Sequence, residues 1–232
     1  MQPEPPPPPA PPTKVEKALE ICVPIFWLAT LYGLYSAATS LDGWQQWATL
    51  FAALPLAWAL ADVLTGLTHW GLDTYGSVET PVIGQTVIKP FRMHHDFPTY
   101  MVQFDATATM ALSAAAVTPL QLGLIYMASF GGWWAVAGGA LMITIVGTVC
   151  TNLFHKWSHM EEPPALGRFL QRTKIALNVA EHDRHHEPPH DCSYCITCGW
   201  MNPILEKIKF FRGLERALRL LGIQPQSELY NH

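Results

Sequence analysis

The run "ATATMALSAAAVTPLQLGLIYMASFGGWWAVAGGALMITIVGTVCTNLF" covers residues 106–154, and none of its 49 residues is charged. A helix needs about 20 mainly apolar residues to cross the hydrocarbon core of a bilayer, so this run is long enough for two crossings. Gly131 and Gly132 divide it into two halves, where glycine allows the chain to turn. The run therefore predicts two membrane-spanning helices, at about 106–129 and 133–154.

Two further apolar segments precede this run. Residues 21–41 carry no charge, and residues 43–72 carry a single one, on Asp62. They predict spans at about 21–41 and 44–70. Helices at the surface of a soluble protein have a polar face, which these segments lack. The predicted fold class is therefore an all-α integral membrane protein with four transmembrane helices.

The two ends of the chain differ from the apolar segments in composition. The first twelve residues hold eight of the twenty prolines, so residues 1–18 are predicted to be a disordered leader. This start lacks the basic and apolar regions of a signal peptide. Residues 19–222 are predicted to form a single membrane-embedded domain, followed by a C-terminal tail at 223–232. The net charge of −4 gives no basic field for nucleic acid, and five cysteines, an odd number, favour reduced thiols.

The basic residues predict the orientation in the membrane. Four crossings place the leader, residues 73–105 and everything after residue 155 on one side, and all fourteen lysines and arginines lie there. The positive-inside rule makes that side cytoplasmic. We therefore expect a multi-pass membrane protein with a cytoplasmic, histidine-rich helical cap. The membrane would be the endoplasmic reticulum in a eukaryote and the inner membrane in a bacterium.

Nine of the ten histidines lie at the cytoplasmic ends of the predicted spans or in the predicted cytoplasmic segments. There they form patterns typical of metal binding. They are His69, His94, His95, His155, His159, His182, His185, His186 and His190. The HxxxH and HxxHH spacings place each group on one face of a helix. Eight or nine imidazoles exceed the four ligands of a structural zinc ion, so they indicate two metals with open positions. Zinc, copper, iron and nickel all accept imidazole, but a nitrogen-rich two-metal site at a membrane surface suits O2 activation on a lipid chain.

Several neighbours are candidates for the surroundings of such a site. Metal-bound histidines usually donate their other N–H to a carboxylate or carbonyl, so nearby aspartates are candidates for this contact. Asn178, four residues before His182, is expected to hold a metal-bound water. Asp62, as the only acid inside a predicted span, is either functional or a partner of a hydroxyl on another helix. The candidate residues are His190, Asp62, Asp73, Asp96, Asp183 and Asn178.

Two other patterns leave alternatives open. Cys192, Cys195 and Cys198 follow a CxxCxxC spacing and, with His190, would suit a separate zinc or iron–sulfur site, although small buried thiols explain them better. Residues 203–222 read as an amphipathic, basic helix that lies on anionic headgroups. This helix would equally dock an acidic electron donor or cover the metal domain.

Four motifs together resemble one family. They are "THWGLDTYGS" at 68–77, "FRMHHDFP" at 91–98, "NLFHKWSH" at 152–159 and "HDRHHEPPHDCSYCITCGWMNP" at 182–203. In this order they are similar to the CarF-type lipid desaturases, a family that includes plasmanylethanolamine desaturase. The resemblance implies that eight histidines, all of those above except His190, are catalytic and bind two iron ions.

The resemblance also implies a reaction and its partners. The enzyme would be an oxidoreductase that uses O2 to insert a vinyl-ether double bond into the alkyl-ether chain of an ether phospholipid, forming a plasmalogen. Because no flavin or haem motif is visible, the electrons would come from an external cytochrome b5-like or ferredoxin-like protein. The alternatives are another membrane di-iron fatty-acyl desaturase or hydroxylase, a zinc-dependent membrane hydrolase, and a non-catalytic metal sensor or transporter.

Overall fold

The computed structural model describes residues 6–226, and the chain divides into two compact units. The apolar unit comprises residues 9–61 and 104–153, and the histidine unit comprises residues 62–103 and 154–226 together with residues 6–8. The boundary between them falls inside two helices, α3 (Trp44–Thr74) and α6 (Gly132–Ser158). Within the described residues, all regular secondary structure is helical.

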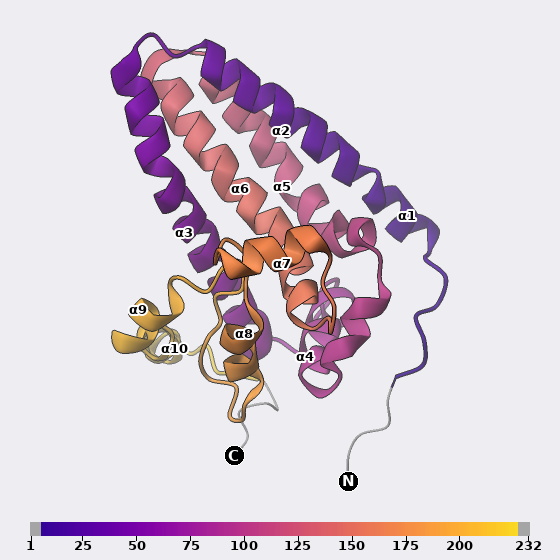
Figure 1. Ribbon diagram of the computed structural model, residues 1–232. Coiled ribbons are helices and arrows are strands. Elements are labelled where there is room, and N and C mark those ends of the chain that lie inside the picture. Colours follow the sequence, from indigo (N-terminus) through magenta and orange to yellow (C-terminus); the bar gives the residue numbers. More distant parts are fainter. Residues whose placement is uncertain (1–5, 227–232) are drawn as a thin grey trace. The chain divides into compact units, whose positions relative to one another are not determined.

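The apolar unit contains the long helices that the sequence predicts. They are α1 (Lys14–Glu20), α2 (Cys22–Thr39), α5 (Ala106–Ala128), the first part of α3 and most of α6. Figure 1 shows α2, α5 and α6 running alongside one another. Four helical segments are long and apolar enough to cross a membrane, at Lys14–Thr39, Trp44–Thr74, Ala106–Ala128 and Gly132–Ser158. The four predicted spans are therefore confirmed as helices, with ends displaced by a few residues.

The predicted leader contains a helix near its end. The helix α1 begins at Lys14, where the Thr13 hydroxyl caps the backbone N–H of Glu16 and the Glu16 carboxylate accepts the N–H of Thr13. This reciprocal capping stabilises a helix start that a reading of the prolines alone overlooks. The remaining parts of the predicted leader and tail include residues 1–5 and 227–232, which lie outside the described residues.

Packing inside the apolar unit uses small residues and satisfied polar groups. Gly33 on α2 lets Met142 and Ile125 approach so closely that a Cβ would lie 2.7 Å from the Ile125 side chain. The Thr144 hydroxyl donates to the Ala57 carbonyl at 2.9 Å, so this buried hydroxyl has a partner. Small residues at helix contacts and internally bonded hydroxyls are typical of membrane helices. By contrast, Leu28 and Leu56 are 68% and 72% exposed, as expected of side chains that face lipid.

The predicted turn at Gly131–Gly132 is present. Both glycines have a positive φ, 72° and 54°. Residues with a Cβ adopt this backbone conformation only at a cost in free energy. The Gly132 N–H donates to the Ser40 carbonyl at 2.9 Å, so the two helix-connecting turns of this unit are joined by a hydrogen bond. A second turn between Thr39 and Trp44 matches the position near Asp42 that the sequence indicates.

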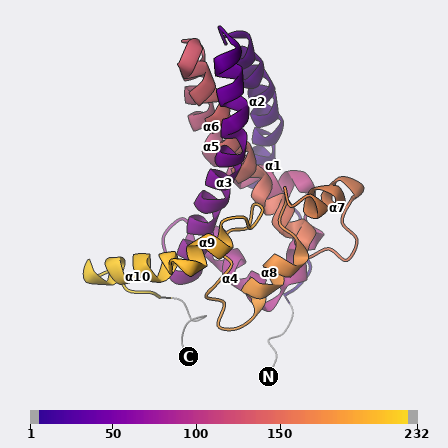
Figure 2. The same ribbon diagram turned by 60° about the vertical axis from the view of Figure 1, so that its left-hand side comes forward.

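The histidine unit is built from short helices and the ends of α3 and α6. The short elements are η1 (Gly84–Ile88), α4 (Lys89–Asp96), η2 (Pro98–Gln103), α7 (Ala165–Arg172), α8 (Val179–His186), α9 (Asn202–Lys207) and α10 (Phe210–Leu220). Figure 2 shows α9 leading into α10, which extends away from α8. An apolar cluster centred on Trp70, Tyr194 and Phe211 forms part of its core.

The predicted amphipathic helix at 203–222 is two helices rather than one. Lys209 has a left-handed backbone (φ 53°), and this residue separates α9 from α10. The apolar face of α10, with Phe211, Leu214 and Leu218, packs against the core of its own unit. Of the three alternatives for this segment, covering the histidine unit is therefore the one that the contacts support, while Ile208 remains 63% exposed.

Candidate metal centre

Five imidazoles of the histidine unit converge on one point. Their ring nitrogens all lie within 4.8 Å of one another, and we call them the five-histidine group: His94, His155, His159, His182 and His186. The helix α4 supplies the first, the last turn of α6 and the residue after it supply the next two, and α8 supplies the last pair. The HxxxH and HxxHH spacings predict that the histidines of each motif share one face of a helix, and the structure confirms this.

The spacing of these nitrogens fits a bound metal better than a hydrogen-bonded cluster. The Nε2 atom of His94 lies 2.8, 3.1 and 3.0 Å from the Nε2 atoms of His155, His159 and His186. One ring nitrogen carries at most one proton, so hydrogen bonds among neutral imidazoles cannot satisfy three such contacts. Ligand nitrogens about 2.0–2.1 Å from a shared metal are about 2.9–3.4 Å apart in octahedral or tetrahedral geometry. The observed separations are close to that range.

A second, adjoining group contains a carboxylate. The ligand atoms of His69, Asp73, His95 and His185, the histidine–aspartate group, also lie within 4.8 Å of one another. Asp73 and His69 are one turn apart on α3, with Asp73 Oδ2 3.2 Å from His69 Nε2. The same carboxylate lies 3.2 Å from His95 Nε2 and 3.4 Å from His185 Nε2. From the sequence, Asp73 is predicted to be a neighbour of the metal ligands. In the structure its carboxylate is itself among the candidate ligands.

Hydrogen bonds to the backbone orient two of these rings. His69 Nδ1 lies 3.1 Å from the Tyr194 carbonyl oxygen, and His185 Nδ1 lies 2.8 Å from that of Cys192. A carbonyl only accepts, so in the neutral rings Nδ1 carries the proton and each Nε2 presents a lone pair. Both lone pairs face the Asp73 carboxylate, another acceptor, and a bound cation between them would remove the repulsion.

Unpartnered polar atoms support the same conclusion. Within residues 6–226, His69 Nε2, His185 Nε2 and Asp73 Oδ2 are buried and have no hydrogen-bond partner. Buried polar atoms in folded proteins are normally satisfied, and protonating both imidazoles would bury two positive charges beside one carboxylate. The donor set of both groups therefore fits metal ions that prefer nitrogen ligands. The two groups adjoin, because His94–His95 and His185–His186 each contribute one ring to each group.

Burial favours the neutral form of three imidazoles outside the spanning helices, those of His94, His159 and His182. Burial first, and then the neighbouring histidines, lower the pKa of His94 and of His182 well below the usual value. The same causes lower the pKa of His159 to about 4. Neutral imidazole is the form that binds metal, so these side chains are ready to bind near neutral pH without losing a proton.

These shifts predict how the metal-free chain responds to acid. In the unfolded chain a histidine binds a proton below a pKa of about 6.5, while His159 in the folded chain does so only near pH 4. The unfolded state therefore holds more protons between these values, and the free energy of unfolding falls as the pH drops through this window. Thermal unfolding of the chelator-treated chain, followed by tryptophan fluorescence in detergent, should show this loss below about pH 6.5. A melting temperature that is constant across the window would contradict it.

Asp62 has a different role from the one expected, since it forms no hydrogen bond or ion pair with a histidine among residues 6–226. It is fully buried, and its carboxylate accepts backbone N–H groups from Thr197, Cys198 and Gly199 on Oδ1 at 2.9–3.1 Å. A fourth N–H, of Met201, donates to Oδ2 at 3.0 Å. Asp62 thus anchors the loop that follows Tyr194, and the residues before this loop carry the carbonyls that orient His69 and His185.

The other predicted neighbours lie outside both groups. Asn178 caps α8, because its side-chain oxygen accepts the Glu181 N–H. Asp96 and Asp183 are exposed. His190 Nδ1 lies 3.0 Å from the His185 carbonyl oxygen, and its ring centroid is 4.8 Å from that of His95. His190 therefore borders the histidine–aspartate group without contributing a ligand atom to it.

The three clustered cysteines do not form a further metal group. All are free thiols, and among residues 6–226 no set of three metal-binding side chains includes a cysteine. Burial raises the pKa of Cys195 and of Cys198, which favours the protonated thiol over the metal-binding thiolate. The Cys195 thiol packs against Gly66, where a Cβ would lie 2.6 Å from the sulfur. These cysteines are packing residues of the loop.

The fold and the site together define a class: a multi-pass helical membrane protein with two adjoining groups of metal-binding side chains. Comparison with known proteins identifies the family. The chain belongs to the lipid desaturase domain family, whose model matches residues 58–228. No solved structure matches the chain.

Three relatives show which activities occur among similar proteins. The plasmanylethanolamine desaturase of Myxococcus xanthus is 37% identical over 180 residues, covering 77% of this chain and 64% of that protein. Plasmanylethanolamine desaturase 1 of Mus musculus is 34% identical over 201 residues, covering 80% and 71%. The chloroplastic fatty acid desaturase 4 of Arabidopsis thaliana is 30% identical over 174 residues, covering 72% and 51%.

Proposed function

We propose that this chain is a di-iron, O2-dependent lipid desaturase that converts the alkyl ether of plasmanylethanolamine to a vinyl ether. The observation that carries the proposal is the pair of adjoining donor groups, eight histidines and one aspartate, in a chain of the lipid desaturase domain family. Two relatives named for plasmanylethanolamine desaturation support the substrate. One alkyl-ether lipid, O2, two electrons and two protons give one vinyl-ether lipid and two waters.

In this proposal the protein positions the metals and excludes water. The five-histidine group holds one iron and the histidine–aspartate group holds the other. Iron supplies the O2 activation, since a C–H bond beside an ether oxygen has no acidity for a side-chain base. The Tyr194 and Cys192 carbonyls keep His69 and His185 turned toward the metal, and His182 and His185, both fully buried, contribute to a dry site.

The electrons must come from outside the chain. We propose a cytochrome b5-like or ferredoxin-like protein on the cytoplasmic side, where the positive-inside rule places the lysines and arginines. The membrane would be the endoplasmic reticulum in a eukaryote and the inner membrane in a bacterium.

Lipid analysis tests the activity. A host without vinyl-ether lipids that expresses this chain and receives alkyl-ether phosphatidylethanolamine should accumulate an acid-labile vinyl ether, detected by mass spectrometry. Separate replacement of His94, His155 and His186 by alanine should abolish the product, because each removes a ligand of the five-histidine group. Western blots of membrane fractions control for insertion. Full product in any of the three variants would remove that residue from the ligand set.

A second candidate is desaturation of a fatty-acyl chain, favoured by the Arabidopsis relative named as a fatty acid desaturase. Supplying the same host with matched acyl and alkyl-ether lipids separates the two: new acyl double bonds without a vinyl ether would favour this candidate. Metal analysis of the purified chain separates both from a hydrolase, for which zinc without iron is expected.

A further inference from the structure

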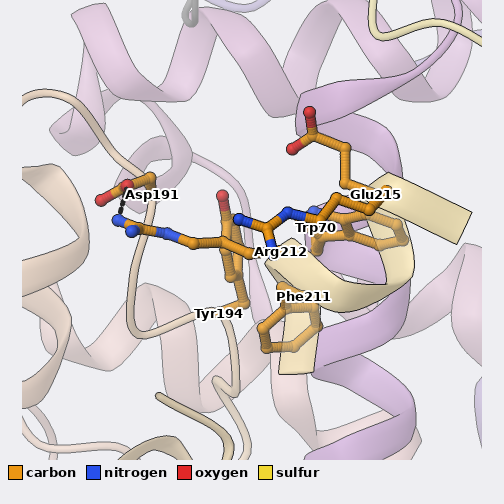
Figure 3. Close-up of a pocket in the computed structure, with 7 residues that line it drawn as sticks. Trp70, Asp191, Tyr194, Phe211, Arg212 and Glu215 are labelled. Carbon is orange, nitrogen blue, oxygen red and sulfur yellow. Dashed lines mark hydrogen bonds and ion pairs between the residues drawn. The ribbon is translucent and has the colours of Figure 1, made fainter. Parts of the chain in front are cut away.

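A cavity outside the metal centre combines aromatic and charged side chains. Its volume is about 260 Å³, and we call it the aromatic pocket. It is lined by Trp70, Asp191, Tyr194, Phe211, Arg212, Glu215 and Arg216. Figure 3 shows Asp191 and Glu215 on opposite sides of it, with aromatic side chains between them. All of these residues belong to the histidine unit.

The pocket lies one side chain away from the candidate metal ligands. The Tyr194 ring, which lines the pocket, has its centroid 5.3 Å from that of His185 and 5.9 Å from that of His69. The same ring also packs against Phe211, with centroids 4.8 Å apart. Tyr194 is therefore a wall shared by the pocket and the histidine–aspartate group.

The chemistry of the proposed reaction requires a polar site at such a place; this step rests on the proposed function. The carbons that become the vinyl ether are the first two of the alkyl chain, next to the glycerol oxygen. The phosphate is separated from that oxygen only by the glycerol backbone, so it must bind within a few bond lengths of the reacting carbons. A desaturase acting in the middle of a chain has no such requirement.

The charges of the pocket match a zwitterion that carries a phosphate and an ammonium group. Arg212 is paired with Asp191 at 2.7 Å, and Glu215 with Arg219 at 2.8 Å. Arg216 forms no ion pair with any residue between 6 and 226, so its guanidinium is available for an anion. Carboxylates beside aromatic rings offer an ammonium both charge and ring faces.

The surface beside the pocket favours a lipid as the source of this zwitterion. Ile204 and Ile208, on and just after α9, are 53% and 63% exposed, and Leu220 at the end of α10 is 89% exposed. Lys207 and Lys209 are interspersed with them. Exposed apolar residues among basic ones are typical of segments that lie in a membrane interface.

We infer that the aromatic pocket binds the phosphoethanolamine headgroup of the ether lipid. Arg216 holds the phosphate, with Arg212 beside it. The ammonium lies against the aromatic rings, close to the carboxylates of Asp191 and Glu215. This contact places the first carbons of the alkyl chain beside the metals and selects ethanolamine, whose N–H groups reach the carboxylates, over the fully methylated choline.

Replacement of Arg216 by glutamine tests the phosphate contact. Loss of a charge-assisted hydrogen bond should raise KM for alkyl-ether phosphatidylethanolamine about tenfold or more in the iron-loaded protein, with a smaller change in kcat. The matched control is Arg172→Gln, which removes the same charge from an exposed arginine at the end of α7 that does not line the pocket. An unchanged KM in Arg216→Gln, or an equal rise in Arg172→Gln, would overturn the assignment.

A binding measurement separates this inference from the proposed function. Equilibrium dialysis of 1-O-hexyl-glycerophosphoethanolamine against the chelator-treated chain should show binding that Arg216→Gln weakens. The choline analogue and inorganic phosphate should compete poorly. Competition by inorganic phosphate as strong as by the lipid analogue would reduce the pocket to a simple anion site and overturn the inference. Headgroup binding by a wild-type chain that makes no vinyl ether would support the pocket and reject the proposed reaction.

Discussion

Replacement of Asp73 by asparagine is expected to remove one of the two irons that we propose for this chain and to abolish the proposed desaturation. Asp73 is the only carboxylate in either donor group, and three imidazole Nε2 atoms surround it at 3.2–3.4 Å. Asparagine keeps the shape of the aspartate side chain. It replaces a negatively charged oxygen, a possible metal ligand, by an NH2 group that faces the imidazole Nε2 atoms. Changes next to metal ligands lower affinity or activity by about 10–100-fold, so loss of a ligand should exceed that range.

Iron per chain, measured by mass spectrometry on purified protein, is the direct test of this prediction. The expected value falls from two in the wild type to one in Asp73→Asn, while the five-histidine group keeps its metal. Glu79→Gln removes an exposed acid and should retain both irons and full turnover. Two irons and wild-type product in Asp73→Asn would exclude Asp73 as a ligand and leave the second metal to histidine alone.

The long-range features of this fold were predictable because they depend on strong periodic patterns. The apolar lengths predict all four spans, and Gly131–Gly132 predict the turn between α5 and α6. The spacings HxxxH and HxxHH predict which rings share a helix face. The structure brings all eight predicted histidines into the two donor groups, and their role as iron ligands stays a prediction.

The features that could not be predicted depend on where loops pass. No sequence pattern shows that Asp62 meets four N–H groups at least 135 residues away. The cap that Asn178 gives α8, by contrast, follows the Asn-x-x-Glu pattern of a helix start, which the metal-site interpretation overlooks. The i, i+4 spacing of His69 and Asp73 placed them together, but only the approach of His95 and His185 makes Asp73 a common neighbour. The break at Lys209 arises from a left-handed backbone that the apolar period of residues 203–222 conceals.

Replacement of Asp62 by alanine is expected to destabilise the chain more than any change of an exposed acid. The substitution leaves four backbone N–H groups without their acceptor, and they belong to a largely buried loop that includes Thr197 and Cys198. Each unsatisfied donor costs about 1–3 kcal/mol, so the sum is at least about 4 kcal/mol. That is a large share of the roughly 5–15 kcal/mol by which a typical domain is stable.

The same substitution should also affect the metals, because the loop is continuous with the carbonyls of Cys192 and Tyr194 that orient His185 and His69. A lower melting temperature in detergent and iron lost from the histidine–aspartate group are therefore expected together. Asp62→Asn retains one oxygen, which keeps the three bonds on Oδ1 and loses that of Met201, so its melting temperature should lie between those of the wild type and Asp62→Ala. Wild-type melting and iron content in Asp62→Ala would show that the loop holds its conformation without this carboxylate.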